Sequence, residues 1–201
     1  MAWAGAGRAV PCTPALRRGR GPGAGVSGAR WRTMPYVADT MTNRLILHPI
    51  DEIEAERILG GVPTPLDSWA PGYPFEGDLE AVGGYLAATV AGGDQRPWGY
   101  YQLVRREDGR AIGGIAFVGP PDTSGTVEVG YGLIPDARGK GYAAEALRGI
   151  IAVARVNGAT RVIAETTSDN IASQRTLRNV GMPRTGSVGD TWRYELELTP
   201  A

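Results

Sequence analysis

The feature that most constrains this chain is a strand-like segment followed by a glycine-rich loop and a helix-like segment, residues 128–147, "EVGYGLIPDARGKGYAAEAL". In residues 126–134, apolar side chains alternate onto one face of a predicted strand. Glu128 shares the other face with Gly130 and Gly132. Because glycines weaken a strand, we expect either a bulge here or a ligand that lies against the bare backbone.

The loop after this strand is typical of an anion-binding site. Gly139 and Gly141 allow several backbone N–H groups to converge, and the start of the following helix adds a partial positive charge. Arg138 and Lys140 add full positive charges. The sequence therefore predicts a site for a phosphate or pyrophosphate group.

Three kinds of phosphate-binding loop compete for this stretch. A Walker A loop needs a serine or threonine after its lysine, but Gly141 follows Lys140. A dinucleotide-binding loop needs a third glycine where Ala144 stands, and the acidic residue that would bind a ribose is missing from the following strand end. The pattern R/Q-x-x-G-x-G/A is matched in full by Arg138, Gly141 and Ala143.

On these residues the chain resembles the GNAT superfamily of acyl-CoA-dependent N-acetyltransferases, over roughly residues 43–198. The loop segment followed by "AETTSDNIASQRTLRNVGM" is similar to the branch of ribosomal-protein alanine and serine N-acetyltransferases. Two positions depart from that pattern: Met182 replaces the usual phenylalanine, and Leu177 stands where many members have a tyrosine general acid. The resemblance implies an α/β GNAT fold, with a mixed, mostly antiparallel central sheet and helices on both faces.

The hydrophobic pattern of the rest of the chain is consistent with such a fold. The Asp-Gly pair in "EDGR", residues 107–110, predicts a hairpin between two strand-like runs. We expect strands near residues 44–48, 98–106, 111–119, 126–134, 161–167 and 191–198, and helices near residues 51–61, 78–93, 142–158 and 170–181.

The resemblance also implies acetyl-CoA as the cosubstrate. Backbone amides of residues 139–143 would hold its pyrophosphate, and Leu133 and Ile134 would pair with the pantetheine arm like an added strand. Asn170 would contact that arm where the next strand diverges, and a backbone N–H near Leu133 or Ile134 would polarise the thioester carbonyl. The implied binding residues are Leu133, Ile134, Arg138, Gly139, Lys140, Gly141, Tyr142, Ala143 and Asn170.

Acetyl transfer needs a neutral amine, and an α-amine with a pKa of about 7.7 is easier to deprotonate at pH 7 than a lysine with a pKa of about 10.4. Glu128 is our candidate general base, because its place between Val127 and Val129 can raise its pKa. It can also be read as an exposed carboxylate that pairs with an arginine. If the base lies elsewhere, Glu76 and Asp78 are the alternatives.

Ser173 in "NIAS" is the candidate donor to the leaving thiolate, since the similar branch places a serine near the sulfur and Leu177 cannot donate a proton. A bond from this hydroxyl to its own helix backbone is the alternative.

The region around Trp69, Tyr73 and Phe75 lines the acceptor groove in the resembling family, although aromatic residues in a long loop equally serve as packing anchors. The acidic character of the chain after Met41 favours a cationic acceptor, either a small-molecule amine or a peptide amine such as a protein N-terminus. A non-catalytic acyl-CoA-binding sensor or assembly domain, and a nucleotide-binding protein, are the alternatives from other classes.

Residues 1–40 are rich in arginine, glycine and alanine, with six arginines and no acidic residue before Asp39. We expect a disordered tail over 1–40 and an N-acetyltransferase domain over 41–201. The tail is interpreted as an extended or misassigned start ahead of Met34 or Met41, as an organelle transit peptide, or as a segment for anionic surfaces.

Composition limits the partners. The formal net charge is zero, which argues against a uniformly basic nucleic-acid binder, and the absence of 18 consecutive apolar residues argues against a membrane span. With one cysteine, Cys12, and one histidine, His48, neither a disulfide framework nor a His cluster for zinc can form. We expect no metal, a structural role for His48, a cytoplasmic location and, as an open possibility, a homodimer.

Overall fold

The computed structural model describes residues 37–65 and 67–199. Its central element is an eight-stranded sheet in the order β1-β2-β3-β4-β5-β6-β8-β7. Within the described residues, β5 and β6 run parallel and every other neighbouring pair is antiparallel. The mixed, mostly antiparallel sheet that the sequence predicted is therefore present.

All ten elements expected from the sequence are found, together with two further strands and one 3₁₀ turn. In chain order, the elements are β1 (Thr40–Met41), β2 (Leu45–Pro49), α1 (Glu52–Gly60), α2 (Glu76–Gly92), β3 (Tyr100–Arg105), β4 (Arg110–Phe117), β5 (Thr126–Leu133), η1 (Pro135–Ala137), α3 (Tyr142–Val156), β6 (Arg161–Thr167), α4 (Ile171–Asn179), β7 (Arg184–Val188) and β8 (Thr191–Glu197).

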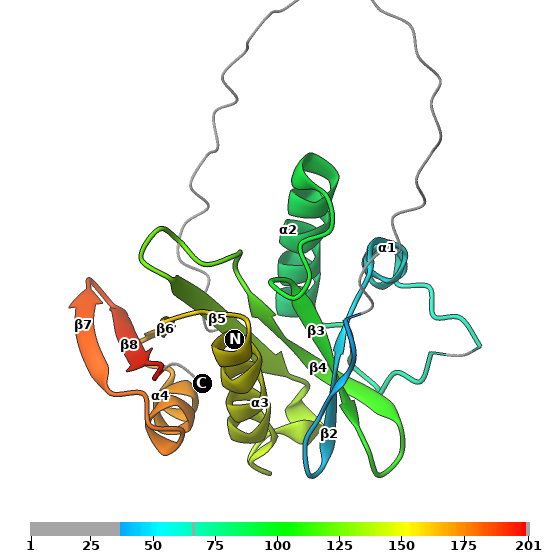
Figure 1. Ribbon diagram of the computed structural model, residues 1–201. Helices are drawn as coiled ribbons and strands as arrows, with labels where there is room; N and C mark the ends of the chain where they lie inside the picture. The colour runs from blue at the N-terminus through cyan, green and yellow to red at the C-terminus, as the bar shows by residue number, and fades with distance from the viewer. Residues whose placement is uncertain (1–36, 66, 200–201) are drawn as a thin grey trace, which may run out of the picture.

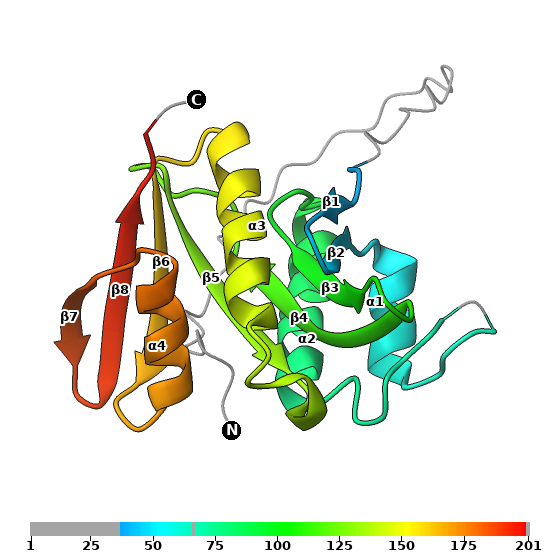
Figure 2. The same ribbon diagram turned by 90° about the horizontal axis from the view of Figure 1, so that it is seen from below.

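The helices cover both faces of the sheet. Helices α1 and α2 lie on one face, and α3 and α4 lie on the other (Figures 1 and 2). Helix α3 carries the chain from β5 to its parallel neighbour β6, as a crossover between parallel strands requires. Its buried stripe packs on the sheet through residues such as Ala146, Leu147 and Ile150.

Local signals set the ends of the elements. Asp51 and Glu54 form a capping box at the start of α1, and Gly61 takes the left-handed conformation after its end, with φ of 61°. The hairpin between β3 and β4 closes with Arg105 opposite Arg110, which confirms the prediction from the Asp-Gly pair.

Strands β1 and β7 were not predicted, because β1 has two residues and β7 is an exposed edge strand without alternation of apolar residues.

The described fold also begins before the predicted boundary at residue 41. Thr40 pairs with Leu47, and Asp39 Oδ1 lies 2.7 Å from His48 Nδ1. Residues 1–36 of the predicted tail lie outside the described residues.

His48 has the structural role expected from the sequence. Its second ring nitrogen lies 3.0 Å from Glu54 Oε1 on α1. The hydrogen bond to Glu54 and the one to Asp39 raise the pKa of His48 to about 9, although burial opposes the shift. The charged ring therefore ties the first strands to α1 at neutral pH.

The glycines of β4 and β5 make room for aromatic side chains, rather than marking a bulge. Gly114 and Gly132 lie opposite each other in the sheet. A Cβ built on Gly114 would come within 2.3 Å of the Tyr100 ring, and one on Gly132 would come within 2.3 Å of the tip of Phe75. Side chains at these two positions would displace both rings from the sheet surface.

Beneath α2, the Tyr100 hydroxyl and the backbone N–H of Phe75 belong to a buried polar network. Tyr100 donates to Asp78 Oδ1 at 3.0 Å, and the backbone N–H of Phe75 donates to Asp78 Oδ2 at 3.2 Å. The hydroxyls of Tyr73 and Tyr100 lie 3.3 Å apart, and Gln102 donates to Tyr73. Asp78 is fully buried, and burial raises its pKa to about 7 despite these hydrogen bonds, which favour the carboxylate.

We expect Asp78→Asn to flatten the dependence of stability on pH. The folded pKa of Asp78 lies above its unfolded value, so the folded state holds the proton more tightly, and wild-type stability falls as pH rises towards and past 7. Asparagine cannot ionise and removes this part of the slope. The check is the difference in melting temperature between pH 6 and pH 8.5, which should be smaller in the variant.

Asp108→Asn is the matched control. The hydrogen bond from Arg105 lowers the pKa of Asp108 to about 2, so this carboxylate does not titrate in that interval. Equal pH slopes for wild type and Asp78→Asn would show that Asp78 is ionised in the folded protein at pH 6.

Candidate active site

The candidate site begins where β5 and β6 separate. These strands pair only over three residues each, from Thr126 opposite Arg161 to Glu128 opposite Ile163. Beyond Glu128 the two strands diverge, as Figure 2 shows. The fork exposes one edge of β5 from within the middle of the sheet.

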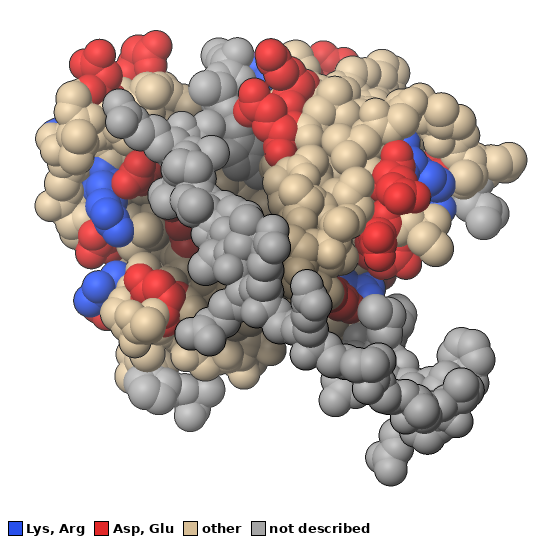
Figure 3. All heavy atoms as spheres, turned by 90° about the horizontal axis from the view of Figure 1, so that it is seen from above, with Lys and Arg blue, Asp and Glu red and all other residues tan. Residues whose placement is uncertain are grey.

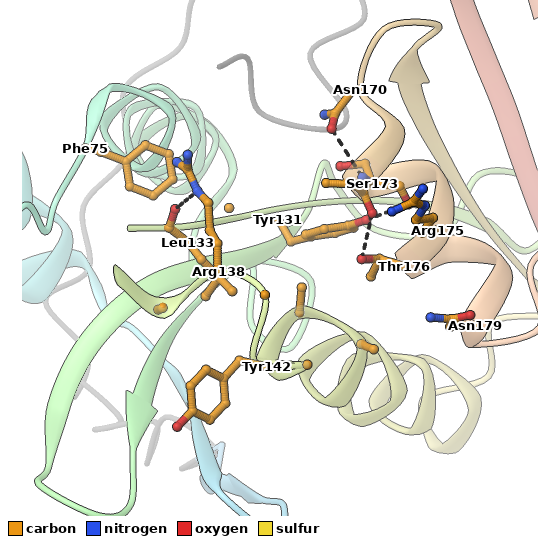
Figure 4. A pocket seen from close by; sticks show the side chains of 17 residues that line it. Phe75, Tyr131, Leu133, Arg138, Tyr142, Asn170, Ser173, Arg175, Thr176 and Asn179 are labelled. Carbon is orange, nitrogen blue, oxygen red and sulfur yellow. Dashed lines mark hydrogen bonds between the residues drawn. The ribbon is translucent and has the colours of Figure 1, made fainter. Parts of the chain in front are cut away.

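A cavity of about 420 Å³ lies at this fork. It is bounded by the end of β5, the glycine loop, the first turn of α3 and one face of α4 (Figure 4). Its lining residues are Phe75, Tyr131, Gly132, Leu133, Ala137, Arg138, Gly139, Gly141, Tyr142, Ala143, Ala144, Asn170, Ala172, Ser173, Arg175, Thr176 and Asn179.

The glycine loop has the backbone geometry predicted for an anion site. Gly139 and Gly141 have φ of 73° and 81°, in the left-handed region that side chains other than glycine rarely adopt. Gly141 is also the N-cap of α3, and the first N–H groups of a helix have no partner within it. The loop therefore presents backbone donors and the positive end of α3 to the cavity.

Arg44 holds this loop from β2, a contact that the sequence interpretation missed. Its Nε donates to Glu145 Oε2 at 2.8 Å, and its NH1 donates to the carbonyl of Lys140 at 2.9 Å. Its guanidinium also lies 4.6 Å from the centre of the Tyr142 ring. Arg44 thus fixes both the loop and the first turn of α3 against the sheet.

The register of the sheet separates the two residues predicted to bind the pantetheine arm. The N–H of Ile134 donates to the carbonyl of Ile112 at 3.0 Å, so it faces β4 and is occupied. Backbone groups alternate along a strand, which turns the N–H and C=O of Leu133 towards the fork. The prediction is therefore corrected for Ile134, which does not line the cavity, and retained for Leu133.

Of the two cations predicted at the loop, Arg138 lines the cavity and Lys140 does not. Arg138 Nε donates to the carbonyl of Leu133 at 2.9 Å (Figure 4). The side chain of Arg138 is therefore tied back to the end of β5.

Glu128 lies at the last paired position before the fork. Within the described residues, its Oε1 is buried and has no hydrogen-bond partner, and it takes part in no ion pair. Burial and the nearby Glu165 raise its pKa to about 7, while Arg193 opposes the shift. The alternative of an exposed, arginine-paired glutamate does not describe this side chain, since Arg193 is paired with Glu195 at 3.0 Å.

The start of α4 forms the opposite wall of the cavity. Asn170 caps this helix, with its Oδ1 accepting from the N–H of Ser173 at 3.2 Å. Ser173 is 8% exposed and lines the cavity. Leu177, by contrast, is fully buried in the core.

Tyr131 is a second functional candidate that the sequence did not reveal, because its place on the apolar face of β5 indicated only packing. Its ring extends from β5 towards α4, and its hydroxyl donates to the carbonyl of Ser173 at 3.4 Å (Figure 4). Burial raises the pKa of Tyr131 to about 12, so the hydroxyl stays protonated at neutral pH.

The three aromatic residues predicted for an acceptor groove separate into two groups. Trp69 and Tyr73 pack edge to face with ring centroids 5.6 Å apart, and Tyr73 is only 6% exposed. Tyr73 is therefore a packing anchor, which corrects the groove prediction for it, whereas Trp69 is partly exposed and its place in an acceptor groove stays a prediction. Phe75 lines the cavity above Gly132 and remains available to a ligand.

The alternative bases do not lie at the fork opening. Asp78 is fully buried in its hydrogen-bond network, and Glu76 is an exposed residue at the first position of α2.

The described residues contain no group of three metal-ligating side chains. In the same part of the chain, no helix is both long and apolar enough to cross a bilayer.

Comparisons with known proteins identify the fold and the family. An N-acetyltransferase of Bacillus subtilis, YjdG, is 29% identical over 111 residues, which cover 54% of this chain and 66%, slightly under two thirds, of that relative. Among solved structures, the ribosomal-protein-S5-alanine acetyltransferase of Vibrio fischeri superposes with a TM-score of 0.57 at 16% identity, covering 80% of this chain and 97% of that one.

RimL, a ribosomal L7/L12 α-N-protein acetyltransferase solved with coenzyme A, superposes with a TM-score of 0.59 at 17% identity, covering 80% of this chain and 98% of that one. At such identities, these structures show that the fold is shared. The sequence profile of the acetyltransferase (GNAT) domain matches residues 44–183, which is more than half of the chain. The chain therefore belongs to the GNAT family of acetyltransferases.

Proposed function

We propose that this acetyltransferase transfers the acetyl group of acetyl-CoA to a primary amine, with Glu128 as the general base. The observation that carries the proposal is a half-buried carboxylate, one oxygen of which is buried without a hydrogen-bond partner, at the point where β5 and β6 part and with a pKa of about 7. A base with these properties can take a proton from an amine at neutral pH.

The cavity fits acetyl-CoA. The two left-handed glycines and the start of α3 suit a pyrophosphate, and residues 139–143 are proposed to bind it through their N–H groups. The fork-facing backbone of Leu133 suits the amide-rich pantetheine arm, and Asn170 faces the same space from α4. Arg138 and Lys140 would add positive charge near the phosphates.

In the reaction, the amine nitrogen attacks the thioester carbonyl carbon, the carbon–sulfur bond breaks, and CoA leaves as a thiolate. Glu128 accepts the proton that the nitrogen loses, directly or through a water molecule. We propose that a fork-facing N–H of β5 near Leu133, separate from those that pair with the pantetheine arm, stabilises the negative charge on the carbonyl oxygen. The thiolate then takes a proton through a hydroxyl on the wall of the cavity, for which Ser173 is proposed, and that hydroxyl takes a replacement proton from solvent.

The acceptor is proposed to be a peptide N-terminus or a small-molecule amine. RimL is described as acting on the α-amino end of a ribosomal protein, and this chain shares its fold. An α-amine also requires less of a base than a lysine side chain does. A non-catalytic acyl-CoA sensor would not need an unpaired carboxylate at the fork, so the enzyme is favoured. We also propose that the protein is cytoplasmic and forms a homodimer.

Gly141→Val should abolish CoA binding. At φ of 81° a β-branched residue is strained, and relief of that strain would turn the loop N–H groups away from the phosphate. We expect CoA to raise the melting temperature of wild type but not of this variant. Gly158→Val is the matched control, because Gly158 has φ of 85°, ends the α3 region and lies outside the cavity. An undiminished CoA shift in Gly141→Val would refute the pyrophosphate assignment.

Glu128→Gln should keep CoA affinity and lower turnover by about 10²–10⁴-fold, the usual contribution of a general base. Because the carboxylate must be ionised, wild-type kcat/KM should rise with pH through about 7, and the variant should lose this step. The deficit should shrink above the pKa of the acceptor, where the amine arrives neutral. Single-turnover rates of thiol release, measured from pH 6 to 10, provide the check.

A uniform deficit at every pH would instead assign Glu128 to acceptor positioning, and an unchanged rate would exclude it as the base. Glu165→Gln is the comparison variant: Glu165, the acidic neighbour of Glu128 on β6, raises the pKa of Glu128, so its removal should move the pH step of kcat/KM to lower pH and leave the rate above that step unchanged.

Ser173→Ala should lower turnover by about 10-fold to 100-fold without weakening CoA binding, because the leaving thiolate would lose its proton donor. Tyr131→Phe is the paired variant, since it removes a second hydroxyl at the same wall, one that donates to the Ser173 carbonyl. Single-turnover rates for both variants are the measurement. If the loss appears only in Tyr131→Phe, the donor is Tyr131, and the Ser173 assignment is wrong.

A further inference from the structure

A second cavity, of about 320 Å³, lies on the α2 face of the sheet. It is walled by one face of α2 and by the segments that begin β3 and follow β4. The lining residues are Glu80, Ala81, Gly84, Tyr85, Ala88, Gln95, Trp98, Gly99, Ala116, Phe117, Val118, Gly119 and Pro120. We call it the α2 pocket.

The α2 pocket is built for an apolar ligand. Its aromatic walls are Tyr85, Trp98 and Phe117, and Val118 at its edge is 65% exposed although it is apolar. The polar atoms of two lining residues are already bonded within the fold: Tyr85 donates to the carbonyl of Ile50 at 2.9 Å, and Gln95 donates to the carbonyl of Gly93. The surface that remains available to a ligand therefore consists mainly of aromatic rings and methyl groups.

The register of the sheet places this pocket beside Glu128. Ala116 lies opposite Gly130, and the N–H of Val118 donates to the carbonyl of Glu128 at 2.9 Å. Directly opposite residues in an antiparallel pair project from the same face. Val118, which lines the α2 pocket, and Glu128 are therefore neighbours on the same face of the sheet, and the Cα atoms of such a hydrogen-bonded pair lie about 5.5 Å apart. Gly130 contributes no side chain to separate them.

The charges around this face suit an amine. Glu80 stands at the rim of the pocket, and Glu165 lies close enough to Glu128 to raise its pKa. On the face that carries α1 and α2, acidic and basic side chains are interspersed among uncharged ones (Figure 3). The nearby Arg193 is paired with Glu165 and Glu195, so an ammonium group that approaches Glu128 meets more carboxylates than cations, while its apolar part meets the pocket.

We propose that the α2 pocket selects the acceptor by taking an aromatic or large aliphatic group carried close to the acceptor nitrogen. This inference rests on the proposed function, since it assumes that the nitrogen is held at Glu128. It defines the acceptor class as amines with a bulky apolar substituent next to the amino end. Small polar amines would fill the Glu128 site and leave the pocket empty.

The test compares matched acceptors with wild-type enzyme and acetyl-CoA. Phenethylamine against ethanolamine, and a peptide that begins with phenylalanine against one that begins with serine, separate a free amine from a peptide source of the same chemistry. We expect kcat/KM to be at least about tenfold higher for the apolar member of a pair. Equal values within both pairs would overturn the inference but leave the proposed function standing.

Gly84→Leu tests the pocket itself. Gly84 lines it from α2, and a Cβ there meets no atom within 4 Å, so a leucine can enter the pocket without disturbing the core. Replacement of a glycine within a helix also favours folding. We expect kcat/KM for phenethylamine to fall about tenfold, with the value for ethanolamine and the thermal shift by CoA unchanged.

Ala87→Leu is the matched control, because Ala87 is an exposed residue of α2 outside the pocket. If Gly84→Leu changes the mass of the particle in solution and leaves acceptor preference unchanged, the pocket binds a second copy of the chain and the inference is overturned. If wild type acetylates none of the amines, the proposed function fails, and this inference fails with it.

Discussion

The parallel contact between β5 and β6 is the constraint on which the rest of the structure depends. Helix α3 must cross one face of the sheet to connect them, and the two strands stay paired for only three residues before they part. Their separation leaves the N–H and C=O groups along one edge of β5 without a strand partner, which is costly in a protein interior unless a ligand or solvent takes that place. The same crossover brings the start of α3 to the mouth of the fork. Backbone acceptors, backbone donors and a helix dipole thus meet in one cavity as a result of topology.

Much of this could be predicted from the sequence, because the strand, the glycine loop and the helix are local and each has its own periodicity or turn chemistry. Contacts between distant segments could not. Arg44 holds the loop through Glu145, 101 residues away, and Gly132 is covered by Phe75 from another loop. Of the predicted pair Leu133 and Ile134, only Leu133 faces the fork, and this depends on strand register, which hydrophobic alternation does not fix for the backbone groups. Tyr131 follows the apolar alternation of β5 and does pack in the core, so its pattern does not reveal that it also lines the cavity.

Two carboxylates of similar pKa show how burial serves different ends. Asp78 and Glu128 both have a pKa of about 7, and in both the principal cause is burial. Asp78 receives two hydrogen bonds and is buried beneath α2, so it cannot exchange a proton with a substrate. Glu128 has one oxygen without a partner beside the fork, so the free energy of burying it is not recovered within the fold. An unrecovered cost of this kind is expected at a functional site, where a substrate supplies the missing partner.

Helix α2 connects these features mechanically. The hydrogen bond between Tyr100 and Asp78 fixes its first turn. Phe75, the residue before the helix, lies on Gly132 at the edge of the cavity at the fork. One face of the same helix walls the α2 pocket next to Glu128. A rigid helix cannot shift at one end without moving the other, so the Asp78 network sets the positions of both walls relative to β5. A buried polar network distant from the reacting atoms would thereby control how closely the acceptor approaches the thioester, and a misplacement of about 1 Å is enough to slow such a reaction greatly.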